Sequence, residues 1–244
     1  MSSRLSTRLS IRWVPGEPSE PTNTLVMSVG GWYVDLRITK ADGSIEWGMA
    51  GERLILSREP LTCKWTHWID SRGYTEPDIG SFHPVDPSVA NADPATDTVE
   101  TGSMLNPETN VETPYEEVWR ALRASHSDRF PWAWIVRSMD KRTFLAQVGG
   151  DFLALRGGPD GPVGEVGFCA RRETWDGEQK RWTVVLEAGE SKNLPALPGM
   201  VGWEAKGRGE GSATEPAWTQ SAKEGDVVEL FGEKYVLCAL ERVA

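Results

Sequence analysis

The stretch TLVMSVGGWYVDLR, residues 24–37, decides the fold, because it recurs 119 residues later as TFLAQVGGDFLALR, residues 143–156. Six positions are identical, including both residues of a central Gly-Gly pair. Each copy places alternating runs on either side of this pair, which is typical of two antiparallel strands joined by a tight turn. We therefore predict one β-hairpin in each half of the chain and a tandem duplication that relates the halves.

The duplication extends outward in the same ungapped register. Further identical pairs at this spacing are Trp13 with Trp132, Glu46 with Glu165, Gly48 with Gly167 and Arg53 with Arg172. Short period-two runs bounded by Gly, Pro, Asp or Asn predict further strands. They lie at residues 9–14, 44–50, 61–69, 132–138, 163–171, 181–188, 226–231 and 234–242. Residues 115–122 are expected to close the first copy, as residues 235–240 close the second.

A unit of short antiparallel strands must protect its edges from pairing with other chains, and closure into a barrel does so. The predicted fold class is therefore all-β, with two antiparallel β-barrels in tandem related by internal duplication. The N-terminal barrel is expected over residues 1–124 and the C-terminal barrel over residues 125–244. The boundary is expected near residues 124–129.

Charge and composition exclude several classes of partner. The 244 residues carry a net charge of −10, which argues against nucleic acid and anionic membrane surfaces, because both attract clustered Lys and Arg. The first residues alternate polar with apolar, so we expect neither a secretion signal nor membrane insertion. Cys63, Cys169 and Cys238 lie in apolar runs and are predicted to be buried, reduced thiols of a cytoplasmic protein.

Metal and cofactor motifs are not found. His67, His83 and His126 lack the spacing of metal ligands. The chain also has none of the usual nucleotide-binding, hydrolase or metalloprotease motifs. We therefore expect no metal and no cofactor.

Two long polar segments interrupt the strand pattern. Residues 73–114 contain eight acidic residues and six prolines but no Lys or Arg, which predicts a long loop on the first barrel. This loop is either a solvated excursion, a lid over the barrel mouth or a protein-docking segment. Residues 189–226 form the corresponding segment of the second copy. Its Trp203 and Trp218 are expected to dock onto a barrel or onto a partner.

The densest polar and aromatic stretch is WTHWIDSR, residues 65–72, at the end of a predicted strand. An imidazole suits proton transfer, and Asp70 and Arg72 would orient a ligand carbonyl or hydroxyl, so His67, Asp70 and Arg72 are the predicted catalytic residues. The alternative is a strand end pinned by a histidine hydrogen bond and an Asp-Arg pair. The predicted substrate-binding residues are Trp65, Trp68, Tyr33, Trp47 and Arg12.

The alternation of residues 32–38 leaves open which face points into the barrel. One face is apolar, and the other carries Tyr33, Asp35 and Arg37, to which Arg12 is added. A barrel buried only inside would turn the apolar face inward, but tandem barrels also bury part of their outer walls. The polar set is therefore either an internal hydrogen-bonded network or a solvated exterior. Four tryptophans of the first copy lack a Trp counterpart in the second, which favours the first barrel as the ligand site.

Four stretches carry a resemblance that spans nearly the whole chain: SIRWVPGEPSEPTNTLVMSVGGWYVDLRI (10–38), THWIDSR (66–72), NPETNVETPYEEVW (106–119) and VGEVGFCARRETW (163–175). Here the chain resembles the fungal Hri family. The resemblance implies two lipocalin-like barrels in tandem. It also implies a cytosolic protein, because the yeast member is a cytosolic interactor of a casein kinase and of a translocation-complex subunit. It implies no catalytic residues. Small cofactor-free β-barrel proteins of fungal secondary metabolism, including hetero-Diels–Alderases, offer a second comparison.

Three functions are compatible with these features, and one of them, a simple carrier of an apolar metabolite, uses the same cavity as the first function below but predicts tight binding without product. The first is a small-molecule-binding double barrel that carries out cofactor-free, non-redox chemistry on an apolar or aromatic molecule, such as dehydration followed by cyclisation. Such chemistry needs a shaped cavity and one or two proton donors. The alternative is a non-catalytic cytosolic adaptor that binds another protein through residues 73–114 or 189–226. An adaptor of this kind would keep its fold on deletion of residues 86–100.

Overall fold

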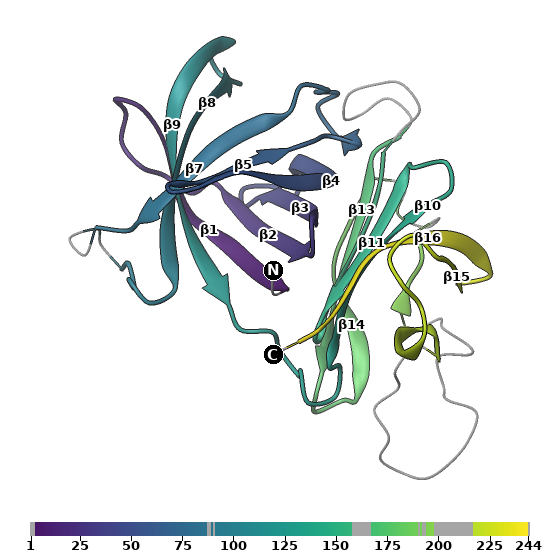
Figure 1. The fold of residues 1–244 in the computed structure, drawn as a ribbon. Coiled ribbons are helices and arrows are strands. Elements are labelled where there is room, and N and C mark those ends of the chain that lie inside the picture. Colours follow the sequence, from purple (N-terminus) through teal and green to yellow (C-terminus); the bar gives the residue numbers. More distant parts are fainter. Residues whose placement is uncertain are drawn as a thin grey trace.

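The computed structural model describes residues 3–86, 89, 91–157, 167–189, 191, 194–197 and 217–243. Within these residues the chain is all-β, with two antiparallel sheets and one 3-10 helix, η3 (Ala217–Gln220), as Figure 1 shows. This confirms the predicted fold class of two tandem barrel-like units. No helix in the described part of the chain is long and apolar enough to cross a membrane.

The first sheet closes into a barrel. Its neighbouring strands follow the order β3-β2-β1-β9-β8-β7-β5-β4, and β3 pairs with β4 to complete the circle. The strands are β1 (Arg4–Trp13), β2 (Thr22–Val29), β3 (Trp32–Thr39), β4 (Ile45–Arg58), β5 (Leu61–Trp65), β6 (Ile69–Asp70), β7 (Asp78–Pro84), β8 (Asp97–Asn106) and β9 (Val111–Leu122). The predicted strand 61–69 is broken after Trp65, and the short β6 pairs with β4 instead.

The second sheet has the same order without the closing strand. It runs β14-β13-β12-β11-β10-β16-β15, and its two edge strands do not pair with each other in the described residues. The strands are β10 (Trp132–Ser138), β11 (Thr143–Val148), β12 (Asp151–Arg156), β13 (Cys169–Asp176), β14 (Arg181–Ala188), β15 (Val227–Leu230) and β16 (Glu233–Arg242). Trp218 of η3 packs on Trp134 with ring centroids 5.9 Å apart, so it docks onto the second unit. Trp203 lies outside the described residues.

The two hairpins match in register. Thr24 pairs with Arg37 and Thr143 with Arg156, and the first glycine of each turn, Gly30 or Gly149, has φ near +57°. Such a φ is readily adopted by glycine. The sequence repeat therefore describes a structural repeat. As predicted, β9 closes against β1 and β16 pairs with β10.

The ungapped register is wrong in the flanking strands. Leu5 pairs with Met27, and Ile135 pairs with Ala146, the equivalent residue of the second hairpin. Leu5 therefore corresponds to Ile135, 130 residues later. Trp13 therefore has no counterpart in Trp132. Likewise, Gly48 pairs with Leu36, and Ala170 pairs with Leu155, the equivalent residue of the second hairpin. Gly48 therefore corresponds to Ala170, 122 residues later. Loops of different length separate these strands in the two copies, so the pairs of Gly48 with Gly167 and Arg53 with Arg172 were coincidences, and Glu165 lies outside the described residues.

The two units pack through equivalent apolar faces. The shared core joins apolar side chains of β2 and β3 with those of β10, β11 and β12, and the two sheets lie side by side in Figure 1. Val34, Leu36 and Ile38 belong to this core, so the apolar face of β3 points out of the first barrel toward the second unit. The polar face of β3 must then point inward.

The predicted acidic loop is wrong as an unstructured segment. Residues 78–84 and 97–106 form β7 and β8, which complete the barrel wall between β5 and β9. Deletion of residues 86–100 would therefore remove part of β8. The three cysteines are buried and free of disulfides, as expected for the burial of the thiols.

Candidate functional site

The inside of the first barrel is a cavity rather than an apolar core. Alternation turns every second residue of β1, β3, β8 and β9 inward, and many of these residues are polar or charged. The enclosed free space is small, about 80 Å³, within a larger unfilled region of about 730 Å³ that is partly open to solvent. Its aromatic walls are Tyr33, Trp47, Trp65, Phe82, Tyr115 and Trp119.

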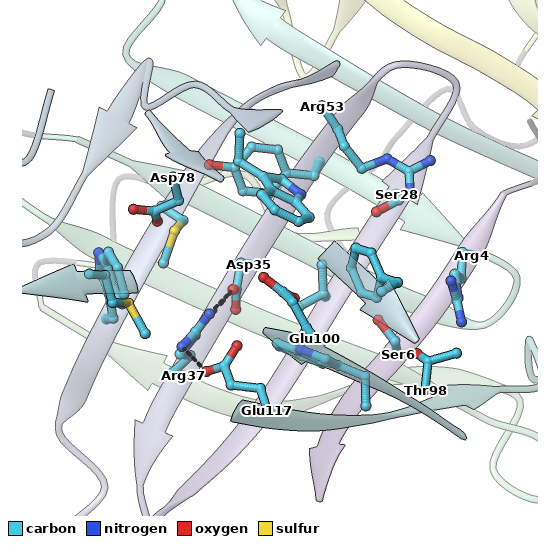
Figure 2. A pocket seen from close by; sticks show the side chains of 18 of the residues that line it. Arg4, Ser6, Ser28, Asp35, Arg37, Arg53, Asp78, Thr98, Glu100 and Glu117 are labelled. Atoms are coloured by element: carbon cyan, nitrogen blue, oxygen red, sulfur yellow. Dashed lines mark hydrogen bonds and ion pairs between the residues drawn. The ribbon is translucent and has the colours of Figure 1, made fainter. Parts of the chain in front are cut away.

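A buried network of charges lies across one side of the cavity. Arg37 donates to Asp35 Oδ2 through Nε and Nη2, at 3.1 and 3.0 Å, and to Glu117 Oε1 at 3.1 Å. Glu117 also accepts from Arg8, which in turn contacts Glu20 at 2.7 Å. Figure 2 shows the central bonds. Asp35 and Arg37 thus belong to an internal network, one of the two alternatives that the sequence left open, whereas Tyr33 lines the cavity and donates its hydroxyl to the Thr66 carbonyl at 3.0 Å.

Glu100 lines the cavity outside this network, and so does Asp78, which pairs with His67. Glu100 lies on β8, is buried, and accepts a hydrogen bond from Tyr115 Oη at 2.9 Å. Burial raises the pKa of Glu100 to about 8, and the nearby Glu117 carboxylate adds to the increase. Glu100 is therefore mostly protonated at neutral pH and can donate a proton.

Two further polar atoms in the cavity wall lack a protein partner. Asp35 Oδ1 is buried without a hydrogen bond, although Oδ2 of the same carboxylate is held by Arg37. Thr98 Oγ1 is likewise buried and without a hydrogen bond. Burial raises the pKa of Asp35. Since buried polar atoms are nearly always hydrogen-bonded in folded proteins, both atoms are candidate contacts for a bound molecule.

The predicted catalytic residue His67 lies behind the cavity wall. Its side chain is fully buried, with Nδ1 3.0 Å from Asp70 Oδ2 and Nε2 3.2 Å from Asp78 Oδ2. Burial alone lowers the pKa of His67, but Asp70 and Asp78 outweigh it and raise the pKa to about 9. His67 is thus a protonated bridge between two carboxylates.

Asp70 and Arg72 surround Trp47 rather than the cavity. Asp70 Oδ2 accepts a hydrogen bond from Trp47 Nε1 at 2.8 Å, and its other oxygen accepts from the backbone of Arg72 at 2.7 Å. The Arg72 guanidinium lies over the Trp47 ring at 4.5 Å and pairs with Glu46. The structure therefore brings His67, Asp70 and Arg72 together, but they gather around Trp47 on the side away from the cavity. This arrangement matches the alternative prediction, in which these residues hold the end of a strand in place.

Comparison with known proteins places the chain in a family. The family model described as Protein HRI1 matches residues 4–219. The chain belongs to the HRI1 family. A solved structure, titled as an uncharacterized protein YLR301w from Saccharomyces cerevisiae, matches this HRI1-family chain with a TM-score of 0.68 and 14% identity, covering 99% of this chain and 100% of that chain. At that identity the likeness shows the fold alone. No curated protein matches the chain.

The predicted substrate-binding residues of this HRI1-family chain divide among three places. Tyr33, Trp47 and Trp65 line the cavity. Trp68 instead packs between Trp32 and Phe144, at centroid distances of 5.0 and 6.3 Å, where the units meet. Arg12 lies outside, with 39% of its side chain exposed, and pairs with Glu116.

The sequence interpretation missed the carboxyl side of the HRI1-family cavity. Glu100 and Thr98 lie on β8, within the segment predicted to be a loop, and Glu117 lies on β9. A signal was available in the alternation of Tyr115, Glu117 and Trp119, which all line the cavity. It was obscured because inward positions here are polar, so the segment lacks the apolar alternation of an ordinary barrel strand.

Proposed function

We propose that the first barrel binds a small organic molecule with an aromatic or otherwise apolar framework and acts on it by cofactor-free acid–base chemistry. The leading reaction is dehydration followed by cyclisation. The observation that carries this proposal is Glu100, a carboxyl group that is buried in an aromatic-lined cavity and whose pKa is raised by this burial. A protonated carboxyl at neutral pH is an effective general acid.

The aromatic walls supply the binding and the orientation. Trp47, Trp65 and Trp119 present large rigid surfaces to the cavity, which favour a flat or apolar framework. Trp47 is itself fixed, by its hydrogen bond to Asp70 and by the guanidinium of Arg72. A ligand held against fixed walls loses little further freedom on reaching a cyclic transition state.

The dehydration step uses the two carboxyl groups in different roles. Glu100 donates its proton to a ligand hydroxyl, the C–O bond breaks, and water leaves. Asp35 Oδ1, which has no protein partner, accepts the proton from the adjacent carbon as the C=C bond forms. Proton exchange through water returns both groups to their starting states, and Arg37 holds Asp35 in place throughout.

Mass spectrometry of reaction mixtures tests this function. The substrates are a panel of apolar tertiary and allylic alcohols, and the readout is loss of one water. We expect turnover by the intact chain and at least about a hundredfold lower turnover by Glu100→Gln, which keeps the shape but cannot donate a carboxylic proton. Glu116→Gln, an exposed neighbour of the network, is the matched control. Equal turnover by Glu100→Gln and the intact chain would overturn the assignment.

The adaptor function has less support from the described residues. Much of the first proposed docking segment forms β7 and β8 of the barrel wall. Most of the second segment, residues 189–226, lies outside the described residues. The charged side chains of the cavity lie inside the barrel, where a protein docked on these segments would not contact them. This placement favours a small molecule over a protein as the ligand.

A further inference from the structure

One end of the cavity carries two arginines. Arg4 on β1 and Arg53 on β4 both line the cavity, and Figure 2 places them at the end away from Asp78. Backbone pairing sets Arg4 opposite Ser28, and the Arg53 amide donates to Gly31 in the turn after β2 at 2.7 Å. Strands from both sides of the β2–β3 hairpin therefore bring two cations to the same end.

The surroundings of Arg4 add hydroxyl groups but no carboxylate partner. Among the described residues, Arg4 forms no ion pair. Burial lowers the pKa of Arg4, and the like charge of Arg53 lowers it further. Ser6, Ser28 and Thr98 line the same end, and Thr98 Oγ1 is buried without a hydrogen bond.

The second unit shows that the fold does not require this charge. The hairpin register places Trp134 where the first unit has Arg4, and Val136 where it has Ser6. Both are fully buried in the apolar core of the second unit. A charged and hydroxyl-bearing end is therefore particular to the first barrel.

We propose that this end is a subsite for an anionic oxygen group of the ligand, such as a carboxylate or an enolate. Guanidinium groups bind planar carboxylates through paired hydrogen bonds, and the Thr98 and Ser28 hydroxyls supply further donors. The Glu100 carboxyl between this end and the charged network does not repel the anion while it is protonated. The subsite rests on the proposed function, since it names the substrate class of the same cavity as an organic anion with an apolar framework.

Two fluorescent dyes of similar framework test the subsite. The probes are 8-anilinonaphthalene-1-sulfonate, an aromatic anion, and N-phenyl-1-naphthylamine, its neutral relative. Both are titrated into the full chain, and binding inside the barrel is checked with Ser6→Phe, which fills the cavity. Circular dichroism confirms that each variant is folded.

We expect the anionic dye to bind at least about tenfold more tightly than the neutral dye. Arg4→Gln and Arg53→Gln should each weaken the anionic dye at least about tenfold and leave the neutral dye within about twofold. Arg58→Gln, an exposed arginine of β4, should change neither. Raising the salt concentration should weaken only the anionic dye in the intact chain, a readout that needs no variant.

The outcomes separate the two proposals. Equal affinity for both dyes, without salt dependence, would overturn the anion subsite while leaving the cavity as a ligand site. Binding of either dye that Ser6→Phe does not reduce, or binding of neither dye, would overturn the ligand cavity and the subsite together.

Discussion

The two halves of the chain share a strand order and differ in what fills the concave side. In the first unit the inward positions include Arg4, Ser6 and Asp35, around a cavity. In the second unit the same positions are Trp134, Val136 and Ala154, inside a closely packed apolar core. One copy has thus kept or gained an ionisable interior while the other is filled with side chains.

The difference identifies which polar residues the fold does not need. Ala154 takes the place of Asp35, and Phe152 that of Tyr33, without loss of the hairpin. Buried ion pairs are weak sources of stability compared with apolar packing. The strand order therefore does not depend on the charged network of the first barrel, which favours the proposed role of this network in ligand binding.

The largest expected effect comes from making the second unit resemble the first. Ala154→Asp would place a carboxylate in an apolar core, where Arg156, the counterpart of Arg37, already donates to the Thr143 hydroxyl at 2.8 Å. Such a group costs at least about 4 kcal/mol of folding free energy, because it must be buried charged or take up a proton. Urea denaturation followed by circular dichroism measures the loss. Val185→Asp on exposed β14 is the control, and an equal effect of both would contradict the comparison.

A smaller effect is expected from breaking the network in the first unit. Glu117→Ala removes the carboxylate shared by Arg8 and Arg37, so that each buried guanidinium keeps only one carboxylate partner, a loss that costs about 3 kcal/mol. Glu116→Ala changes the adjacent pair with Arg12, in which 37% and 39% of the side chains are exposed. It should cost less than about 1 kcal/mol. Similar values from the same denaturation experiment would show that the interior network is not special.

The smallest effect concerns the dependence of stability on pH. The folded-state pKa of His67, about 9, lies above its ordinary value of 6.5. The contacts of protonated His67 with Asp70 and Asp78 therefore make their full contribution to the free energy of unfolding below pH 6.5. This contribution is lost as the pH rises from 6.5 to 9. The pKa of Glu100 is raised from 4.5 to about 8 in the folded chain. Ionisation of Glu100 therefore also lowers the free energy of unfolding as the pH rises from about 4.5 to 8.

Removal of the imidazole separates the two groups. His67→Gln should flatten the fall of the melting temperature above pH 8 and leave the part caused by Glu100. His83→Gln, in an exposed position on β7, should leave the profile unchanged. An unaltered slope in His67→Gln would show that Asp70 and Asp78 do not hold the proton on the ring.

The sequence predicts the fold well where apolar residues alternate. Residues 132–138, 143–148 and 181–188 were predicted to the residue as β10, β11 and β14. The duplication was found from its hairpin, where the turn fixes the register. The flanking register was wrong because loop lengths differ between the copies, and such differences do not show in a short ungapped match.

The site was predicted only for its aromatic side. Tyr33, Trp47 and Trp65 could be chosen because they share strands with clear alternation. Glu100 and Thr98 could not, since β8 turns polar residues toward a polar cavity and so resembles a solvated loop. His67 is an isolated imidazole in its predicted strand, and the sequence holds no sign that Asp78 contacts it from another strand.

The ionisation of Glu100 in the intact chain tests the central claim most directly. Protein labelled with ¹³C at the glutamate carboxyl carbons is titrated by NMR, and Glu100→Gln assigns the resonance. We predict a midpoint near pH 8, so that the group is a proton donor at neutral pH. A midpoint at or below about pH 5, the ordinary range of a glutamate, would contradict the acid–base function of the first barrel.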